Sequence, residues 1–151
     1  MNEELRIRLR RRVIFNTLKK FIPSIDNELY IEIEETKLIS EKLYRKVDEI
    51  KAYEDLNKDE YSNLKRVLAY KEKFKMIFNE SAILFHYEDD ETGAIRIKVK
   101  DFFENLYDIS SFTGFSKGCG DLVLINEDLK YGVCIERYEY FNKLVVWTES
   151  E

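Results

Sequence analysis

The spacing of apolar residues changes near residue 81, and this change is the strongest limit on what the chain can fold into. Before Ser81 apolar residues recur every three to four positions, as on a helix, and after it they alternate, as on a strand. All five glycines follow residue 92, where turns are expected. We therefore expect an α+β fold, with N-terminal helices packed on one face of a mainly antiparallel sheet of about five or six strands.

Residues 3–22 open the helical half. From Val13 to Phe21 the pattern is helical, and Pro23 ends it. Residues 3–10 alternate apolar and charged side chains, so helix and strand both stay open there, with helix favoured.

Asn57 and Glu60 have the spacing of a capping box, with Leu56 and Tyr61 placed as a hydrophobic staple. This pattern predicts a break near Asp55 between two consecutive helices, either a tight hairpin or a kink. The further elements expected in this half are a strand over 29–34 and helices over 36–54 and 57–78.

The second half predicts a hairpin followed by an antiparallel meander. An acidic turn with Gly93 joins the hairpin strands, and a glycine-rich loop over 113–120 precedes the meander. The elements expected are strands over 82–88 and 94–99, a short helix over 101–109, and strands over 122–125, 131–138 and 144–148.

The length of 151 residues fits a single domain over 1–151. No apolar run approaches the length that crosses a bilayer, and residues 1–12 do not form a secretory signal. Cys119 and Cys134 are the only cysteines, which favours reduced thiols over a disulfide framework. These features predict a cytoplasmic protein with no membrane partner.

Five of the nine arginines lie at Arg6, Arg8, Arg10, Arg11 and Arg12. Residues 1–20 hold seven basic and two acidic side chains, a charge of +5, which leaves −10 for the rest of a chain whose total is −5. Such a cluster could bind phosphates, an acidic lipid surface or an acidic partner. We favour internal pairing or a plain solvent-facing surface, and Glu32, Glu34 and Glu35 are the acidic residues expected to receive the arginines if both segments are strands.

Few residues here could carry catalysis. His86 is the only histidine, and with Cys119 and Cys134 it could hold zinc only at a spacing that matches no zinc motif. Cys119 with His86 as base and Asp121 as orienting group is the only catalytic triad that the composition permits, and nothing in the spacing supports it. We expect no catalytic residue, no metal and no cofactor.

Two other segments are better suited to bind a protein partner: the acidic turn over residues 88–91 and the aromatic residues over 138–141. Carboxylates attract a basic surface, and Tyr and Phe bury area at small entropic cost. The residues that we expect to contact a partner, besides the five arginines, are Glu88, Asp89, Asp90, Glu91, Tyr138, Tyr140 and Phe141.

The segment from Gly120 to Ile135, GDLVLINEDLKYGVCI, is a strand, an acidic turn and a strand. Over about residues 115–148 it resembles the C-terminal strands of small bacterial immunity proteins, the cytosolic neutralisers encoded beside polymorphic toxins. The resemblance implies a non-enzymatic protein that binds one toxin and masks its basic or catalytic surface.

The sequence therefore favours a non-enzymatic cytosolic protein-binding module, with an immunity protein against a basic toxin domain as its specific form. The alternative is a nucleic-acid-associated regulatory protein that uses Arg6–Arg12, although a pI near 5.2 opposes general nucleic-acid binding. A cysteine-dependent enzyme is the third reading.

Overall fold

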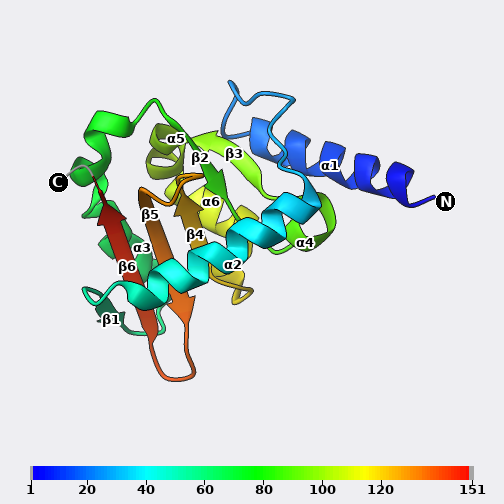
Figure 1. Ribbon diagram of the computed structural model, residues 1–151. Coiled ribbons are helices and arrows are strands. Elements are labelled where there is room, and N and C mark those ends of the chain that lie inside the picture. Colours follow the sequence, from blue (N-terminus) through cyan, green and yellow to red (C-terminus); the bar gives the residue numbers. More distant parts are fainter. Residues whose placement is uncertain (1, 150–151) are drawn as a thin grey trace.

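The computed structural model describes residues 2–149, and its centre is a six-stranded sheet in the order β1-β6-β5-β4-β2-β3 (Figure 1). Every neighbouring pair of strands is antiparallel, so the predicted α+β class is confirmed. The strands are β1 (Glu54–Leu56), β2 (Ser81–Leu84), β3 (Ile95–Lys98), β4 (Leu122–Ile125), β5 (Tyr131–Arg137) and β6 (Asn142–Thr148). The helices are α1 (Glu3–Lys19), α2 (Ile33–Glu49), α3 (Glu60–Leu68), α4 (Asp89–Thr92), α5 (Val99–Glu104) and α6 (Leu106–Thr113), with 3₁₀ turns η1 (Lys71–Ile77) and η2 (Phe115–Lys117).

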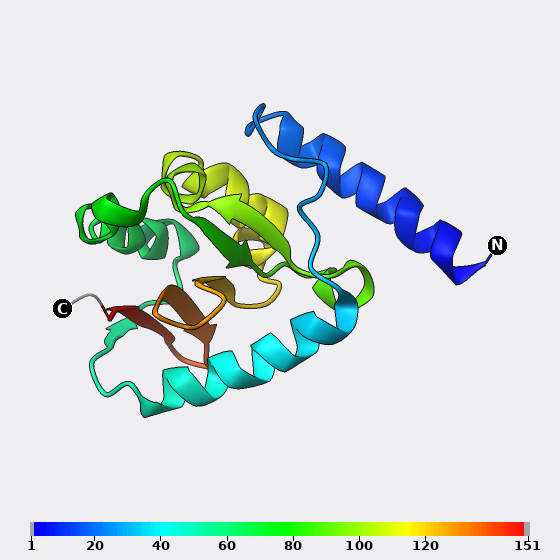
Figure 2. The same ribbon diagram turned by 45° about the horizontal axis from the view of Figure 1, so that its top comes forward.

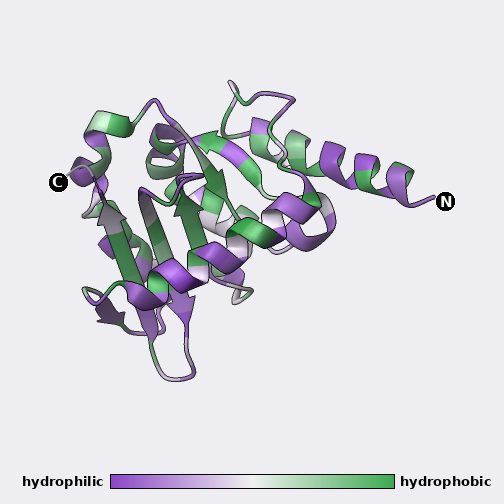
Figure 3. Ribbon diagram, viewed as in Figure 1, coloured by the Kyte–Doolittle hydropathy of each residue, from purple (hydrophilic) through white to green (hydrophobic). Residues whose placement is uncertain are grey.

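Helices cover both faces of the sheet, so the expectation of helices on one face was wrong (Figures 1 and 2). On one face α2 packs Leu43 and Val47 against strand residues such as Val123. On the other face α3, α5, α6 and the end of α1 pack against the alternate strand residues, such as Leu124. All four residues of β4 are therefore buried, and β4 is hydrophobic along its length, whereas the edge strand β1 is hydrophilic (Figure 3).

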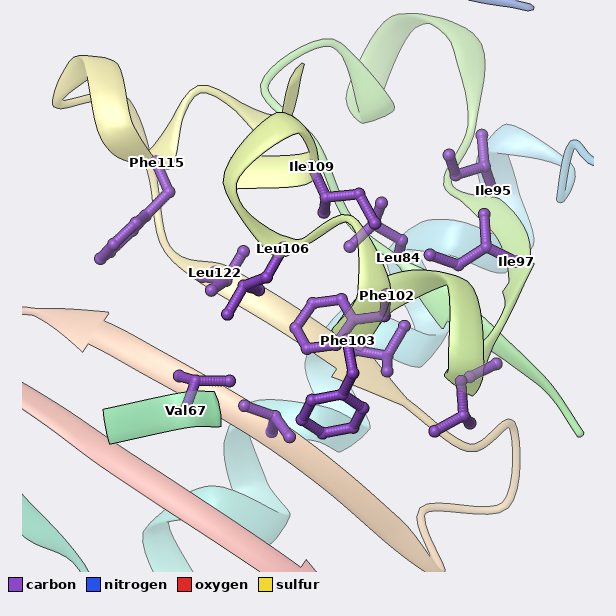
Figure 4. Close-up of a cluster of buried hydrophobic side chains, with 14 of the residues drawn as sticks. Val67, Leu84, Ile95, Ile97, Phe102, Phe103, Leu106, Ile109, Phe115 and Leu122 are labelled. Carbon is purple, nitrogen blue, oxygen red and sulfur yellow. The ribbon is translucent and has the colours of Figure 1, made fainter. Parts of the chain in front are cut away.

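Aromatic rings fill the larger of the two cores. Phe102 and Phe103 of α5 meet edge to face with centroids 5.2 Å apart, and Phe74 of η1 lies 5.3 Å from Phe103. Leu106 and Ile109 of α6 continue this cluster towards β4 (Figure 4). Within residues 2–149 no helix is both long and apolar enough to cross a lipid bilayer. The single domain over 1–151 stays a prediction.

The helical alternative for residues 3–10 is the correct one. Asn2 caps α1, since its Oδ1 accepts a hydrogen bond from the Leu5 amide at 2.8 Å. The N-terminal half of α1 projects from the body in both views (Figures 1 and 2), and its buried residues are Ile14 and Leu18. The first half of the helix therefore has no apolar face in the core, which explains its ambiguous sequence pattern.

The strand predicted over 29–34 was wrong. Leu29 and Ile31 are buried as expected, but the segment forms only an isolated bridge from Tyr30 to Ile95, and α2 begins at Ile33. The predicted helix over 36–54 is confirmed as α2, which starts three residues earlier and ends at Glu49.

The region after α2 differs from the predicted helix over 57–78. Residues 54–56 pair with β6 as an edge strand, which separates the two helices near the predicted break. The capping box does not form, because the Asn57 Oδ1 accepts from the Asp59 amide at 3.0 Å and from the Ser62 hydroxyl at 2.8 Å. Helix α3 ends at Leu68, and η1 replaces the expected continuation.

The second half follows the predicted order of elements, although β2 ends at Leu84, four residues before the end of the strand predicted over 82–88. Strands β2 and β3 pair as the expected hairpin, α5 and α6 occupy the region of the short helix, and β4, β5 and β6 form the meander. The hairpin connection is different: residues 89–92 form the helical turn α4, and Gly93 after it has φ 91° and ψ 152°.

Gly93 lies where no side chain fits. A Cβ there would come 1.9 Å from the Ile31 carbonyl oxygen, and its φ is positive. Gly118 also has a positive φ, of 81°, but a Cβ there would meet nothing within 4 Å.

We predict that Gly93→Ala lowers the free energy of unfolding by roughly 3 kcal/mol or more, while Gly118→Ala lowers it by roughly 1–2 kcal/mol. Urea unfolding at unchanged m-value measures both, and equal midpoints for the two variants would contradict the steric argument.

Candidate functional site

A cavity of about 490 Å³ lies between the first half of α2 and the loops beyond β2 and before β4. Its apolar floor includes Phe85 and Val123, and its rim is mostly polar. The remaining lining residues are Thr36, Lys37, Ser40, Glu41, Tyr44, His86, Tyr87, Asp89, Asp90, Thr113, Gly120 and Asp121.

His86 lies in the wall of this cavity and is only 6% exposed. Its Nδ1 accepts a hydrogen bond from the Glu88 amide at 3.2 Å, so the ring proton is on Nε2, which donates to the Gly93 carbonyl at 3.0 Å. Burial lowers the pKa of His86, and the Gly93 hydrogen bond opposes this effect. Both ring nitrogens are thus occupied in the neutral form, and the histidine closes the loop over 86–93.

The two other members of the permitted triad also have separate partners. Asp121 accepts the Tyr44 hydroxyl at 2.7 Å and the Arg137 amide at 2.9 Å. Cys119 is exposed, and its Sγ lies 3.9 Å from the Lys117 carbonyl oxygen. Among residues 2–149 no hydrogen bond joins Cys119, His86 and Asp121, so the structure does not assemble the triad.

The zinc ligands considered from the sequence are not brought together either. Cys134 is buried in the face of β5 that packs against α2, and burial raises the pKa of its thiol. Cys119 is exposed in the loop before β4. The described part of the chain contains no group of three His, Cys, Asp or Glu side chains that could hold a metal ion.

Carboxylates dominate the rim of the cavity. Asp89 accepts the His86 amide through Oδ2 at 2.9 Å, and burial raises the pKa of Asp89 to about 6, with Asp90 adding to the rise. Glu41 and Asp121 also line the cavity, where Lys37 is the one lysine or arginine in its lining. The cavity therefore presents an acidic opening.

The four residues of the acidic turn divide between two roles. Glu88 accepts from Arg10 Nε at 2.9 Å, and Glu91 lies 3.6 Å from the same nitrogen. Asp89 and Asp90 face the cavity. The expectation that this turn contacts a partner stays a prediction, and in the present structure Glu88 and Glu91 pair with α1.

The arginine cluster divides in a similar way. Arg10 pairs with α4, and Arg11 donates from Nε to the Thr92 carbonyl at 2.9 Å, with its guanidinium 4.7 Å from the centre of the Tyr30 ring. Arg6, Arg8 and Arg12 have no hydrogen bond or ion pair to any residue from 2 to 149.

Two of the five arginines, Arg10 and Arg11, therefore pair within the fold, but their partners are Glu88, Glu91 and the Thr92 carbonyl. Glu32, Glu34 and Glu35, the residues expected to receive the arginines, do not do so, because both segments are helical there instead of paired strands.

The turn between β5 and β6 presents three aromatic residues that we call the aromatic tip: Tyr138, Tyr140 and Phe141. The rings of Tyr138 and Phe141 stack with centroids 5.0 Å apart at 9°, and Tyr140 is 84% exposed. The Lys58 ammonium donates to the Tyr138 carbonyl at 2.6 Å, and the Tyr138 amide donates to the Phe141 carbonyl at 3.0 Å. Contacts within the chain therefore hold Tyr138 and Phe141, while the Tyr140 side chain stays exposed.

Acidic residues connect the aromatic tip to the cavity. Asp121 lines the cavity and accepts, through Oδ1, the backbone amide of Arg137, which directly precedes Tyr138. Burial raises the pKa of Tyr138, and the charges of Glu136, Asp48 and Asp121 add to the rise. One oxygen of Glu136 is buried without a hydrogen-bond partner, 3.9 Å from the Lys143 ammonium. We call Glu41, Asp48, Asp89, Asp90, Asp121 and Glu136 the acidic face.

Sequence reasoning missed the contribution of α2 to this surface. Glu41, Tyr44 and Asp48 have the spacing i, i+3, i+7, which places them on one side of a helix. That signal was available in the sequence. The proximity of Asp121 and Glu136 to these residues was not, because it depends on which sheet face α2 covers.

The fold and this surface define a mixed helix-and-sheet protein with an acidic, aromatic exterior and no assembled reactive group in residues 2–149. The model of the YxiF protein family matches residues 14–147, and the chain belongs to that family. The match includes the acidic face and the aromatic tip, whereas Arg6–Arg12 precede it. No curated protein and no solved structure matches the chain.

The raised pKa of Asp89 predicts a specific dependence of stability on pH. Folding lifts this pKa from 3.8 to about 6, so the folded state binds the proton more tightly, and the stabilisation from protonation is lost as pH rises through about 6. We expect Asp89→Asn, whose amide oxygen can still accept the His86 amide, to be more stable than the wild type at pH 7.5 by on the order of 1–3 kcal/mol.

This advantage should shrink as pH falls from 7 to 5, which urea unfolding across that range measures. Asp128→Asn removes the same charge from an exposed position outside the cavity and serves as the control. A constant difference between Asp89→Asn and the wild type at all pH values would contradict the assignment.

Proposed function

We propose that this chain is a non-enzymatic protein-binding module that binds a basic protein surface through its acidic face and aromatic tip. The observation that carries the proposal is the arrangement of these two features side by side. Asp121 lines the acidic cavity, and its Oδ1 accepts the backbone amide of Arg137 at 2.9 Å, directly before Tyr138 of the aromatic tip.

The two parts have complementary roles in binding. Exposed aromatic side chains, Tyr140 above all, supply contact area at low entropic cost and are enriched among residues that dominate interface energies. The carboxylates supply attraction and orientation for a cationic partner. The charge of −10 beyond residue 20 acts over a longer range and speeds the encounter with such a partner.

The engagement of the potentially reactive side chains supports a non-enzymatic role. Both nitrogens of His86 are occupied, and Asp121 is bonded to Tyr44 and to the Arg137 amide. A general base needs a free nitrogen or oxygen within reach of its substrate. The polar groups of this region serve the fold and the charge of the surface.

A toxin domain is the particular partner that the resemblance to immunity proteins supports. The strand, acidic turn and strand over Gly120–Ile135 are present as β4 and β5. Many toxins that act on nucleic acids carry a basic surface, which an acidic face would cover. The proposal places the protein in the cytosol, where Cys119 and Cys134 would stay free thiols.

Charge reversal on the acidic face tests the proposal. Affinity capture from the source cell with the wild type should recover one stoichiometric basic protein, whose dissociation constant is then measured at low and at moderate salt. We expect Glu41→Lys and Asp90→Lys each to weaken binding by about tenfold or more, and Tyr140→Ala to cost on the order of 2 kcal/mol.

Glu72→Lys is the matched control, since Glu72 is exposed on η1 and lies outside the acidic face. It should bind nearly as tightly as the wild type. Recovery of no partner at low salt, or equal weakening by the control, would contradict the proposal.

Nucleic-acid binding is a second candidate because Arg6, Arg8 and Arg12 are unpaired within the described residues. Gel-shift titration against salt tests it: a steep loss of affinity with salt is expected, which the triple alanine variant should flatten. No shift at low ionic strength would eliminate this candidate.

A further inference from the structure

Three of the clustered arginines gather around one pocket instead of forming a row along α1. Arg8, Arg11 and Arg12 are spaced i, i+3, i+4, which puts them on neighbouring parts of one helix side. They line an open pocket of about 410 Å³ between α1 and the segment before α2. The other lining residues are Phe15, Asn27, Glu28 and Tyr30.

The inner wall of this pocket is held in place before any ligand binds. Arg11 donates from Nε to the Thr92 carbonyl at 2.9 Å, and its guanidinium lies over the Tyr30 ring. The Tyr30 hydroxyl donates to the Arg11 carbonyl at 2.8 Å. These contacts fix the guanidinium of Arg11 while its terminal nitrogens remain without a hydrogen bond in residues 2–149.

The outer wall supplies unpaired positive charge. Arg8 and Arg12 make no hydrogen bond or ion pair within the described chain. Glu28 is the one carboxylate in the lining, so the lining carries three positive charges against one negative charge. Guanidinium groups that line one pocket repel one another, and an anion bound between them would offset that repulsion.

We propose that this pocket, the arginine cradle, binds the phosphoryl groups of a small diphosphate-type ligand. The guanidinium group presents parallel N–H donors that match two phosphate oxygens, and several such groups around one space favour a multiply charged oxyanion. The pocket is larger than one phosphate needs, which favours two linked phosphoryl groups. Asn27 adds an amide that can donate to a bridging or terminal oxygen.

The placement of the remaining arginines separates this ligand from a nucleic-acid strand. A strand needs a row of cations along its backbone, whereas Arg10 turns to α4 and Arg6 does not line the pocket. The arginine cradle is also independent of the proposed protein-binding role, because none of its residues belongs to the acidic face or the aromatic tip. Either proposal can fail without the other.

Calorimetric titration of the full chain with inorganic pyrophosphate, at constant ionic strength, tests the arginine cradle. We expect saturable binding, weaker binding of inorganic phosphate, and a loss of at least about tenfold in pyrophosphate affinity for Arg8→Ala and for Arg12→Ala. Arg8→Lys keeps the charge but not the planar fork, so it should recover only part of the loss.

Arg6→Ala is the matched control, because it removes the same charge from the same helix at a position outside the pocket. It should bind pyrophosphate within about twofold of the wild type, and circular dichroism should show every variant folded, since Arg6, Arg8 and Arg12 are exposed. The absence of saturable binding, or equal weakening by Arg6→Ala, would overturn the proposal. A single-stranded oligonucleotide that binds more tightly than pyrophosphate and loses affinity with Arg6→Ala would also overturn it, in favour of a nucleic-acid track.

Discussion

The hydrogen bonds that close residues 86–94 organise both charged surfaces of the protein. His86 joins the two ends of this segment through Glu88 and Gly93, and the Ile31 amide donates to the Ala94 carbonyl at 2.9 Å. Thr36 of α2 accepts the Ala94 amide at 3.0 Å. The start of α2 and the acidic turn are thereby held at a fixed distance, and the cavity between them depends on this distance.

Because both faces of the sheet are buried, the strands could be predicted from the sequence but their packing could not. The strands β4, β5 and β6 were predictable because their apolar runs are bounded by turns, and turn chemistry is local. The two cores were not predictable, since a fully apolar strand such as Leu122–Ile125 gives no sign of which helix covers which face.

The errors in the first half have a shared physical cause. Leu29, Ile31 and Ile33 alternate like a strand, but Ile33 begins α2, because tertiary contacts outweigh a short local pattern. Asn57 has a capping sequence, yet its side chain bonds within its own turn, as Asn often does. The three-residue strand β1 has no periodicity to detect, and it exists because β6 offers an edge.

The sequence predicted which residues belong to the candidate site but not how they are arranged. The sequence singled out the acidic turn, the aromatic tip and the arginines, but pairing over 78 positions, such as Arg10 with Glu88, has no local signal. The structure shows that α4 separates opposite charges: Glu88 and Glu91 neutralise Arg10, while Asp89 and Asp90 point to the cavity. A chain with +5 in its first 20 residues and −10 in the rest can thus keep two surfaces of opposite sign apart. Because Arg10 already engages Glu88 and Glu91, and Arg11 joins α1 to the Thr92 carbonyl, the free positive charge of α1 is left to Arg6, Arg8 and Arg12, which form no ion pair within residues 2–149.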